Sequence, residues 1–484
     1  MKIMKHIALL LLPLALLISS CDDLLKEEVY GSITTENFWK TEDDATAAIK
    51  AAYSETRGGW QGLSIWQFIV EDIGTDIGTG GYFSTYTYSS YTDWSATNPD
   101  FPGWGIWPAF WQSISYANLV LDNVPGMDID EDYKNRVLGE AHAIRAMVYF
   151  HLVNWFGGVP VLTTTSDTRL KIPRESADSV YNLILSDLKA AVDVLPAKSD
   201  LMDMGELDYG RISKYAAEAL LAKTYLQLGM YTECAEATLD ILKSGEYTLE
   251  PNYQDIFSFA NEGYSNKEVL WVLPFIAGTT PVVDGLVLQV YMYRAPEISD
   301  YDEYFDWSGD IRSTTSFYNS FEEGDLRRDG LFLSGESGTD PVMLLKYPAD
   351  PSTDGKYSGN DYPFIRLADV ILMRAEALAR ENDLQGAVTE INKVRSRAGL
   401  GDIDASNFTR ETLLAHILKE RRWELYFEGH AKQDMIRLDR EGMLNHIKSL
   451  SEDWERFTAE RYLLLPIPSG ALSANPALEQ NPDF

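Results

Sequence analysis

The sequence predicts a mainly α-helical protein built on tetratricopeptide-like helix pairs, and two observations lead to this prediction. The first is an internal repeat, because residues 219–242 and 372–395 align without gaps. Each copy has small residues where two helices would pack closely, and Gly or Asn at the turn between them; such pairs stack to bury a shared core. The second is helical apolar periodicity in several further segments. The aligned pairs are Ala222 with Ala375, Tyr225 with Leu378, Gly229 with Asn382, Tyr231 with Leu384, and Cys234 with Ala387.

Helices are predicted wherever apolar residues recur at helical spacing. The first has Thr41 as its cap, followed by acids in its first turn. A later helix stops at Gly157 and Gly158, and another is ended by Pro196. The predicted helices cover residues 41–57, 107–124, 135–156, about 176–195, the two copies of the repeat, and 411–438.

Two regions lack this helical period. Residues 58–105 are rich in Gly, Ser, Thr and aromatic residues, and we expect long loops with short strands there. The period is lost again from about 253 to 362, where "EVLWVLPF" and "GLVLQVYMY" predict strands between loops rich in aromatic residues, Gly and Asp. The chain ends in "YLLLPIPSGALSANPALEQNPDF", which predicts an extended tail with four prolines.

The first twenty residues are predicted to be a lipoprotein signal peptide. Lys2 and Lys5 precede an apolar run over residues 7–18, which is too short to span a bilayer as a mature helix. The run ends in "LISSC", so cleavage would expose Cys21 for lipidation; an ordinary secretory signal with an accidental cysteine is the alternative. Several acyl chains on one residue hold a protein stably, so we expect the mature chain to lie on a membrane.

Charge and cysteine content narrow the classes of partner. The net charge is −33, and a surface of that sign repels nucleic acid and anionic lipid headgroups. Between Arg57 and Lys134 the chain holds ten Asp and Glu, no Lys or Arg, and six of its twelve Trp.

The cysteines are not expected to form an internal disulfide. With Cys21 lipidated, Cys234 is the only other cysteine, so it has no partner for such a bond. The place of Cys234 in the repeat predicts a packing role.

Motifs of catalytic chemistry are absent from the sequence. It has no HExxH, CxxC or GxSxG, and no Gly-rich phosphate loop between a strand and a helix. We therefore expect neither an enzyme nor a bound cofactor. His142 and His151 lie nine residues apart on one predicted helix, where packing is the better interpretation.

Three glutamates, Glu420, Glu424 and Glu428, follow one another at four-residue spacing and would line one face of a helix. Paired carboxylates can act as acid and base. Basic residues stand close by, however, so a solvated or ion-paired helix face is the better interpretation. These basic residues are Arg421, Arg422 and Lys432.

One segment has oxygen-bearing side chains at a spacing that is typical of a metal-binding loop. In "DPSTDGKYSGND", residues 350–361, oxygen-bearing side chains stand at positions 1, 3, 5, 9 and 12, with Gly at position 6. That pattern resembles a calcium loop of the EF-hand type. Pro351 and the lack of an incoming helix oppose it, and an ordinary turn is the alternative. The candidate ligands are Asp350, Ser352, Asp354 and Asp361.

Aromatic loops are the most distinctive functional feature of the sequence. "GYFSTYTYSSYTDW", residues 81–94, holds six aromatic residues and no positive charge. It belongs to a first aromatic window, residues 60–107; a second covers residues 291–321. Brought together, the two windows would form an exposed apolar patch with a polar rim, which usually marks a binding site. Sugar rings lie flat on aromatic faces while acids and amides take their hydroxyls. The alternative is that these rings pack loops onto helices.

Several distinctive motifs run along the whole mature chain. They are the Cys21 junction, "WQSISYAN", "GEAHAIRAMVYFHLVNWFGGVPV", "KYAAEALLAKTYLQLGMY", "PFIRLADVILMRAEAL", "INKVRSRAGL", "ERRWELYFEGH" and "LPIP…NPALEQNP". Together they resemble the motifs of the SusD/RagB family of outer-membrane nutrient-binding lipoproteins. The resemblance implies a mainly α-helical fold in which four tetratricopeptide-like helix pairs form a right-handed superhelical scaffold, capped by variable loops and short β-hairpins.

The resemblance also implies a domain organisation, a location and a partner. Residues 21–484 would form one domain, with an N-terminal part to about 250 that holds the aromatic loop 58–107. The C-terminal part would hold a loop region, 253–362, and helices over 363–450. Asp22 and Asp23 resemble the family's surface-export signal, which implies the cell surface of the outer membrane. The implied partner is a SusC-like TonB-dependent transporter, to which the protein delivers oligosaccharides.

Ligand residues of this family lie in variable loops, so the candidates here rest on position and chemistry. We expect a non-catalytic binder of neutral or weakly charged oligosaccharides. A RagB-like binder of peptides is the alternative, and it would favour strand edges and mixed pockets over flat aromatic faces. The candidates for stacking are Tyr82, Tyr86, Trp94 and Trp104 in the first window and Tyr291, Tyr293 and Trp307 in the second, with Asp76 and Asn98 for hydroxyls.

Overall fold

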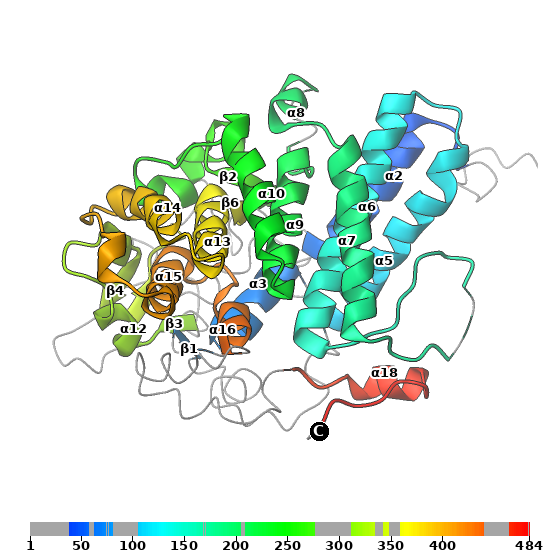
Figure 1. The fold of residues 1–484 in the computed structure, drawn as a ribbon. Helices are drawn as coiled ribbons and strands as arrows, with labels where there is room; N and C mark the ends of the chain where they lie inside the picture. The colour runs from blue at the N-terminus through cyan, green and yellow to red at the C-terminus, as the bar shows by residue number, and fades with distance from the viewer. Residues whose placement is uncertain are drawn as a thin grey trace, which may run out of the picture.

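The structure is a computed structural model that describes residues 38–57, 62–73, 75, 77–80, 105–167, 169, 171–204, 209–275, 311–333, 342–347, 359–439, 464–482 and 484. In these ranges the protein is mainly α-helical, as the sequence predicts. The longer helices stand side by side in Figure 1, from α2 and α5 on one side, through α9 and α10, to α13 and α14 on the other. The α-helices are α2 (Glu42–Arg57), α3 (Leu63–Gln67), α5 (Ile106–Asn123), α6 (Glu131–Phe156), α7 (Ala177–Val194), α8 (Lys198–Met204), α9 (Lys214–Leu228), α10 (Tyr231–Ser244), α12 (Thr315–Asn319), α13 (Leu367–Arg380), α14 (Leu384–Arg397), α15 (Arg410–Leu425), α16 (Ala431–Asp439) and α18 (Ser469–Ala474).

Helices that follow one another in the chain pack on one another in this row. α2 packs on α5, α5 on α6, α6 on α7, α7 on α9, α9 on α10, α10 on α13, and α13 on α14 and α15. This is the order of stacked helix pairs, in which each pair needs neighbours to cover its apolar faces. The main hydrophobic core follows the row from Ala45 in α2 to Val394 in α14.

The two copies of the sequence repeat form the pairs α9–α10 and α13–α14. Both turns contain a residue in the left-handed region, Gly229 with φ +75° and Asn382 with φ +68°. Glycine and asparagine adopt that conformation most readily, which explains their place in the repeat. The residue after each turn donates its amide to the carbonyl of Tyr225 or Leu378, at 2.9 and 2.8 Å. The two turns therefore have the same backbone conformation and an equivalent hydrogen bond each. This confirms the alignment of the two copies.

Other predicted helix signals are also confirmed. Gly157 ends α6 with φ +77°, and α7 ends two residues before Pro196. Cys234 is fully buried in α10, as its small-residue position predicts. His151 is buried and hydrogen-bonds through Nδ1 to the Met147 carbonyl, 2.8 Å away, so packing accounts for it.

Two small antiparallel sheets interrupt the helices. One has four strands in the order β1–β3–β5–β4, and the other pairs β2 with β6. β2 lies within the predicted strand "EVLWVLPF", whereas the other predicted strand, residues 285–293, lies outside the described residues. The strands are β1 (Gly78–Gly80), β2 (Val269–Leu273), β3 (Ile311–Ser313), β4 (Leu331–Leu333), β5 (Val342–Leu344) and β6 (Tyr362–Arg366). Short 3₁₀ turns are η5 (Val124–Gly126), η7 (Tyr253–Phe257), η8 (Phe259–Asn261), η9 (Gly263–Ser265), η10 (Leu326–Gly330) and η11 (Ala405–Asn407).

Residues 63–73 are helical, and the prediction of loops with short strands is wrong for them. The α-helix α3 continues directly into a π-helix, η2 (Phe68–Ile73). Leu63 and all residues from Trp66 to Ile73 are buried. The helical run is only eleven residues long and stands in a segment rich in Gly, Ser, Thr and aromatic residues, so its period does not stand out.

Residues 411–438, predicted as one helix, form two. α15 ends at Leu425 and α16 begins at Ala431, and between them Phe427 has φ +53° and Gly429 has φ +77°. Three successive carbonyls in this break accept side-chain donors instead of helix amides. The donors are Lys346 Nζ to Tyr426 at 2.6 Å, Tyr347 Oη to Phe427 at 2.8 Å, and Tyr362 Oη to Glu428 at 2.9 Å.

The three glutamates of this region are ion-paired, as expected, but the expectation of a solvated face is wrong. The side chains of Glu420, Glu424 and Glu428 are all buried, and Glu428 lies beyond the end of α15. Their partners come from distant segments instead of the neighbouring basic residues named above. The pairs are Glu420 with Arg327 and Arg395, Glu424 with Arg327, Arg366 and Arg397, and Glu428 with Arg366 and Lys346.

Candidate ligand-binding region

Two short strands, one from each aromatic window of the sequence, pair with each other. β1 belongs to the first window and β3 to the second, and they pair antiparallel with Gly80 opposite Ile311. The carbonyl of Ile77 also accepts hydrogen bonds from the Thr314 amide at 3.1 Å and the Ser313 hydroxyl at 3.0 Å. Gly80, the last residue of β1, and Ile311, the first residue of β3, therefore lie side by side.

None of the nine predicted ligand residues is among those that the structure describes, so their contacts stay a prediction. Those nine are Asp76, Tyr82, Tyr86, Trp94, Asn98, Trp104, Tyr291, Tyr293 and Trp307. Cys21 and the signal peptide also lie outside the described residues.

Two tryptophans of the first window belong to the core. Trp66 and Trp107 are buried, and Trp107 packs edge-on against Phe156 with ring centroids 4.9 Å apart. Trp111, the first residue of the next helical turn, is half-buried against Trp107 and Tyr149. For these residues the packing interpretation of the window's aromatics holds.

Two carboxyl groups of η2 fasten the start of the first window to the C-terminal helices. Asp72 Oδ2 accepts the Gly429 amide at 2.8 Å, and Glu71 Oε2 accepts the Gln433 amide at 2.9 Å. β1 begins only five residues after η2 ends. Burial raises the pKa of Glu71 to about 7 and that of Asp72 well above its usual range.

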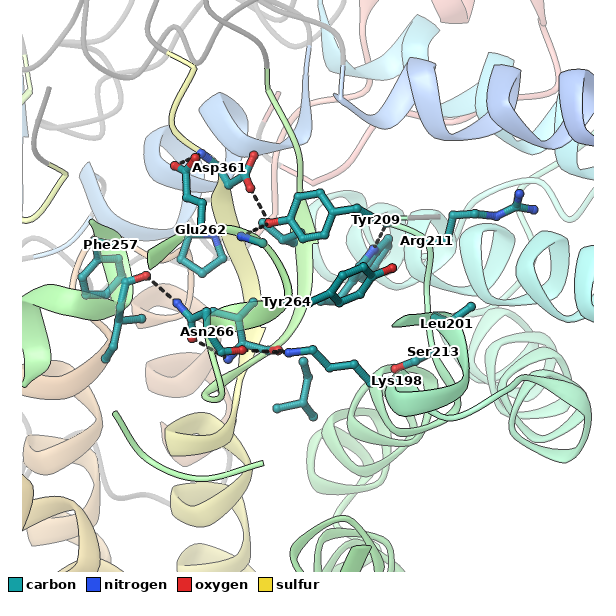
Figure 2. Close-up of a pocket in the computed structure, with 18 residues that line it drawn as sticks. Lys198, Leu201, Tyr209, Arg211, Ser213, Phe257, Glu262, Tyr264, Asn266 and Asp361 are labelled. Carbon is teal, nitrogen blue, oxygen red and sulfur yellow. Dashed lines mark hydrogen bonds between the residues drawn. The ribbon is translucent and has the colours of Figure 1, made fainter. Parts of the chain in front are cut away.

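A cavity lies where Tyr209, the turn that holds Glu262 and Tyr264, and the start of strand β6 meet. Figure 2 shows Tyr209, Tyr264, Glu262 and Asp361 along one part of its wall, with Lys198 and Asn266 below them. The rings of Tyr209 and Tyr264 meet edge to face, with centroids 5.4 Å apart. The volume open to the centres of water-sized molecules is about 40 Å³, so the cavity can hold ordered water.

Asp361, one of the calcium candidates, takes part in the wall of this cavity. Its Oδ1 accepts the Phe275 amide at 3.0 Å, and its Oδ2 accepts the Tyr209 hydroxyl. Burial raises the pKa of Asp361 to about 6. Asp350, Ser352 and Asp354 lie outside the described residues, and among the residues that the structure covers no cluster of three potential metal ligands occurs. Both carboxylate oxygens of Asp361 thus already have protein donors.

Sequence reasoning missed Tyr209, Glu262 and Tyr264. They lie in "LDYG" and "NEGYS", short segments between helices that carry no spacing or motif of their own. Their one shared signal is a tyrosine next to glycine, which is too common in turns to indicate a cavity.

Comparisons with known proteins agree with the fold. A family described as "SusD family" matches residues 336–484, and one described as "Starch-binding associating with outer membrane" matches residues 76–226. The chain is 29% identical to "SusD-like protein P25" of Formosa agariphila, with 95% of each chain covered. It is 24% identical to "Starch-binding protein SusD" of Bacteroides thetaiotaomicron, over 77% of this chain and 76% of that protein. A solved structure, "Laminarin binding SusD-like protein", superimposes with a TM-score of 0.74 at 25% identity, covering 92% of this chain and 100% of that one.

A stacked-helix scaffold with two small sheets, together with these matches, defines the class of protein. The chain belongs to the SusD/RagB family. In the part of the chain that the structure covers, no helix is both long enough and apolar enough to cross a bilayer.

Proposed function

We propose that this protein is a non-catalytic, surface-exposed glycan-binding lipoprotein that passes oligosaccharides to a SusC-like TonB-dependent transporter. The observation that supports the proposal is the pairing of β1 with β3, one strand from each aromatic window. Flat Trp and Tyr faces with nearby acids and amides suit sugar rings and their hydroxyls. The names of two relatives, one starch-binding and one laminarin-binding, support this ligand class.

The ligand class is tested with the protein lacking residues 1–20 on an array of neutral, sulfated and uronic glycans, with a peptide library alongside. We expect binding to neutral or weakly charged oligosaccharides, because residues 58–133 hold ten acids and no cation. Starch-derived and laminarin-derived oligosaccharides belong on the array. Binding to peptides without any glycan would overturn the proposal in favour of a peptide importer.

Membrane attachment is proposed to depend on Cys21 alone. In a Cys21→Ala variant, expressed without the transporter, we expect soluble protein, because the thiol that carries the acyl chains is gone. Fractionation followed by circular dichroism checks both location and fold. Persistent membrane association of a folded variant would contradict the prediction, and the wild-type chain provides the matched control.

Delivery is proposed to need a stable complex with the transporter. Extraction of outer membranes in mild detergent, followed by affinity purification of the tagged protein, is expected to recover a partner of β-barrel size. The Cys21→Ala variant, added to the same extract, shows whether the lipid is needed for the complex. Repeated recovery of the wild-type protein alone would count against a stable complex.

A further inference from the structure

A second cavity lies inside the protein, where α3, α6 and α9 meet the break between α15 and α16. Figure 1 shows α3 and α16 next to each other near the middle of the row of helices. About 40 Å³ of the cavity is open to the centres of water-sized molecules, more than the roughly 10–15 Å³ that one water needs. Nearly all residues around it are buried. Polar atoms that face it therefore need a partner from the protein or from a bound molecule.

The side-chain amide of Gln67, the last residue of α3, has one atom without a partner in this cavity. Its Nε2 lies 3.3 Å from His151 Nε2. His151 Nδ1 lies 2.8 Å from the Met147 carbonyl and must donate to it, because a carbonyl only accepts. Burial lowers the pKa of His151 to about 4, so the ring is neutral and its Nε2 accepts from Gln67. Gln67 Oε1 is then the free acceptor; it is buried and has no donor among the described residues.

His430, directly before α16, has an unpartnered donor in the same cavity. Lys223 Nζ lies 2.8 Å from His430 Nδ1, and an ammonium group only donates, so Nδ1 accepts. Burial and the charge of Lys223 lower the pKa of His430 to about 3, so the ring is neutral and carries its proton on Nε2. The Asp369 carboxylate is 4.0 Å from Nε2, beyond hydrogen-bond distance. Nε2 makes no hydrogen bond to any residue that the structure describes.

The free acceptor and the free donor belong to segments that are in direct contact. Gly429, the residue before His430, lies so close to Gln67 that a Cβ added to Gly429 would be 2.6 Å from Gln67 Cβ. Asp72 Oδ2 holds this contact by accepting the Gly429 amide at 2.8 Å. Gln67 and His430 therefore line one small cavity from neighbouring walls.

The charged groups around the cavity favour a neutral occupant. Asp434 already accepts from Arg421 Nε at 2.6 Å and from Arg437 Nη2 at 2.8 Å. A metal cation would face the positive charges of Lys223, Arg421 and Arg437, which also line the cavity. A halide could not donate the hydrogen bond that Gln67 Oε1 lacks. Water can accept one hydrogen bond and donate another, so it suits both atoms.

We propose that this cavity is a binding site for an ordered water molecule, which accepts a hydrogen bond from His430 Nε2 and donates one to Gln67 Oε1. Buried waters of this kind satisfy polar groups that the protein leaves unpaired, and they are costly to remove. This water joins α3, in the N-terminal part of the chain, to the break between α15 and α16. The proposal goes beyond the proposed function and does not depend on the ligand.

The first test is a high-resolution crystal structure of the mature wild-type protein, grown in chloride and then soaked in bromide. We expect a water peak within about 2.7–3.2 Å of both His430 Nε2 and Gln67 Oε1, without anomalous signal from bromide. A bromide peak at this place would overturn the proposal in favour of an anion site. A cavity without electron density would overturn it as well.

The second test counts long-lived internal waters in solution by oxygen-17 magnetic relaxation dispersion. In His430→Phe the donor is gone and a ring fills its place, so we expect about one such water fewer than in wild type. His142→Phe is the matched control, because His142 is partly exposed and hydrogen-bonds Asp187 at 2.7 Å away from the cavity. The same count in folded His430→Phe as in wild type would overturn the proposal. If His430→Phe does not fold, the crystal structure of the wild type decides by itself.

Discussion

Replacing Arg366 by methionine is expected to lower the free energy of unfolding by about 3–5 kcal/mol, because it breaks several buried ion pairs at once. Arg366 contacts Glu268, Glu424 and Glu428, and all four side chains are at most 1% exposed. Its loss leaves buried carboxylates with fewer partners, and the desolvation cost of their charge then goes uncompensated. Urea unfolding followed by circular dichroism measures the change.

The matched control is Arg169→Met, which removes a surface ion pair with Asp167 on an exposed arginine. No measurable loss is expected, because solvent and salt screen such pairs. A similar small effect in Arg366→Met would show that the buried network adjusts without its central cation, contrary to the prediction.

The same variant should respond differently to acid. Burial raises the pKa of Glu428, but the charges of Arg366 and Lys346 outweigh it and hold the pKa below its ordinary value; the pKa of Glu424 is lowered in the same way. Ionised glutamates with lowered pKa stabilise the fold at pH values above the unfolded pKa, and that stability is lost as the pH falls through the folded pKa. In Arg366→Met burial is less offset by positive charge, so these glutamates take up protons at a higher pH than in wild type. The variant therefore regains stability as the pH falls from about 7 toward the unfolded pKa of about 4, a range in which the wild-type glutamates stay ionised, and the stability deficit relative to wild type is expected to shrink there. A constant deficit would contradict this account.

Trp94→Ala is expected to weaken glycan binding by on the order of 2 kcal/mol, about thirtyfold in affinity. A stacked aromatic ring contributes about 0.5–1.5 kcal/mol beyond its buried area, and losing the indole also exposes the sugar face. The melting temperature should barely change, since the sequence predicts Trp94 in a loop outside the helical scaffold. Calorimetric titration with the glycan that the array selects, and a thermal melt, check the two parts.

Trp107→Ala serves as the matched control from the same window. Trp107 is buried against Phe156, so its removal is expected to cost about 3–5 kcal/mol of stability. Unchanged affinity in Trp94→Ala would remove Trp94 from the site. A drop in its melting temperature as large as that of Trp107→Ala would assign it to the core.

Much of the scaffold could be predicted because its signals are local. The turns at Gly229 and Asn382 need a left-handed conformation, which few residue types adopt readily, so the repeat could be aligned residue by residue. The end of α6 at Gly157 follows from the same physics. Residues 63–73 were missed because their helical run is short and stands in a segment rich in Gly, Ser, Thr and aromatic residues.

Features that depend on distant partners could not be predicted. The break after Leu425 arises because Lys346, Tyr347 and Tyr362 donate to carbonyls of the break, and nothing near Leu425 in the sequence announces these donors. The two aromatic windows could be recognised from composition, whereas their attachment could not. The strands β1 and β3 are three residues long, too short for an alternating pattern to stand out.

The pairing of Gly80 with Ile311 has a consequence for how such a protein can diversify. Two loops that are attached at neighbouring points of a scaffold can change in sequence together, while their attachment points stay the same. Lengthening a flexible loop costs little, about 0.6 kcal/mol for each doubling. If residues 81–104 and 276–310 carry the ligand site, as proposed above, their sequences can change without altering the packing that folds the helices.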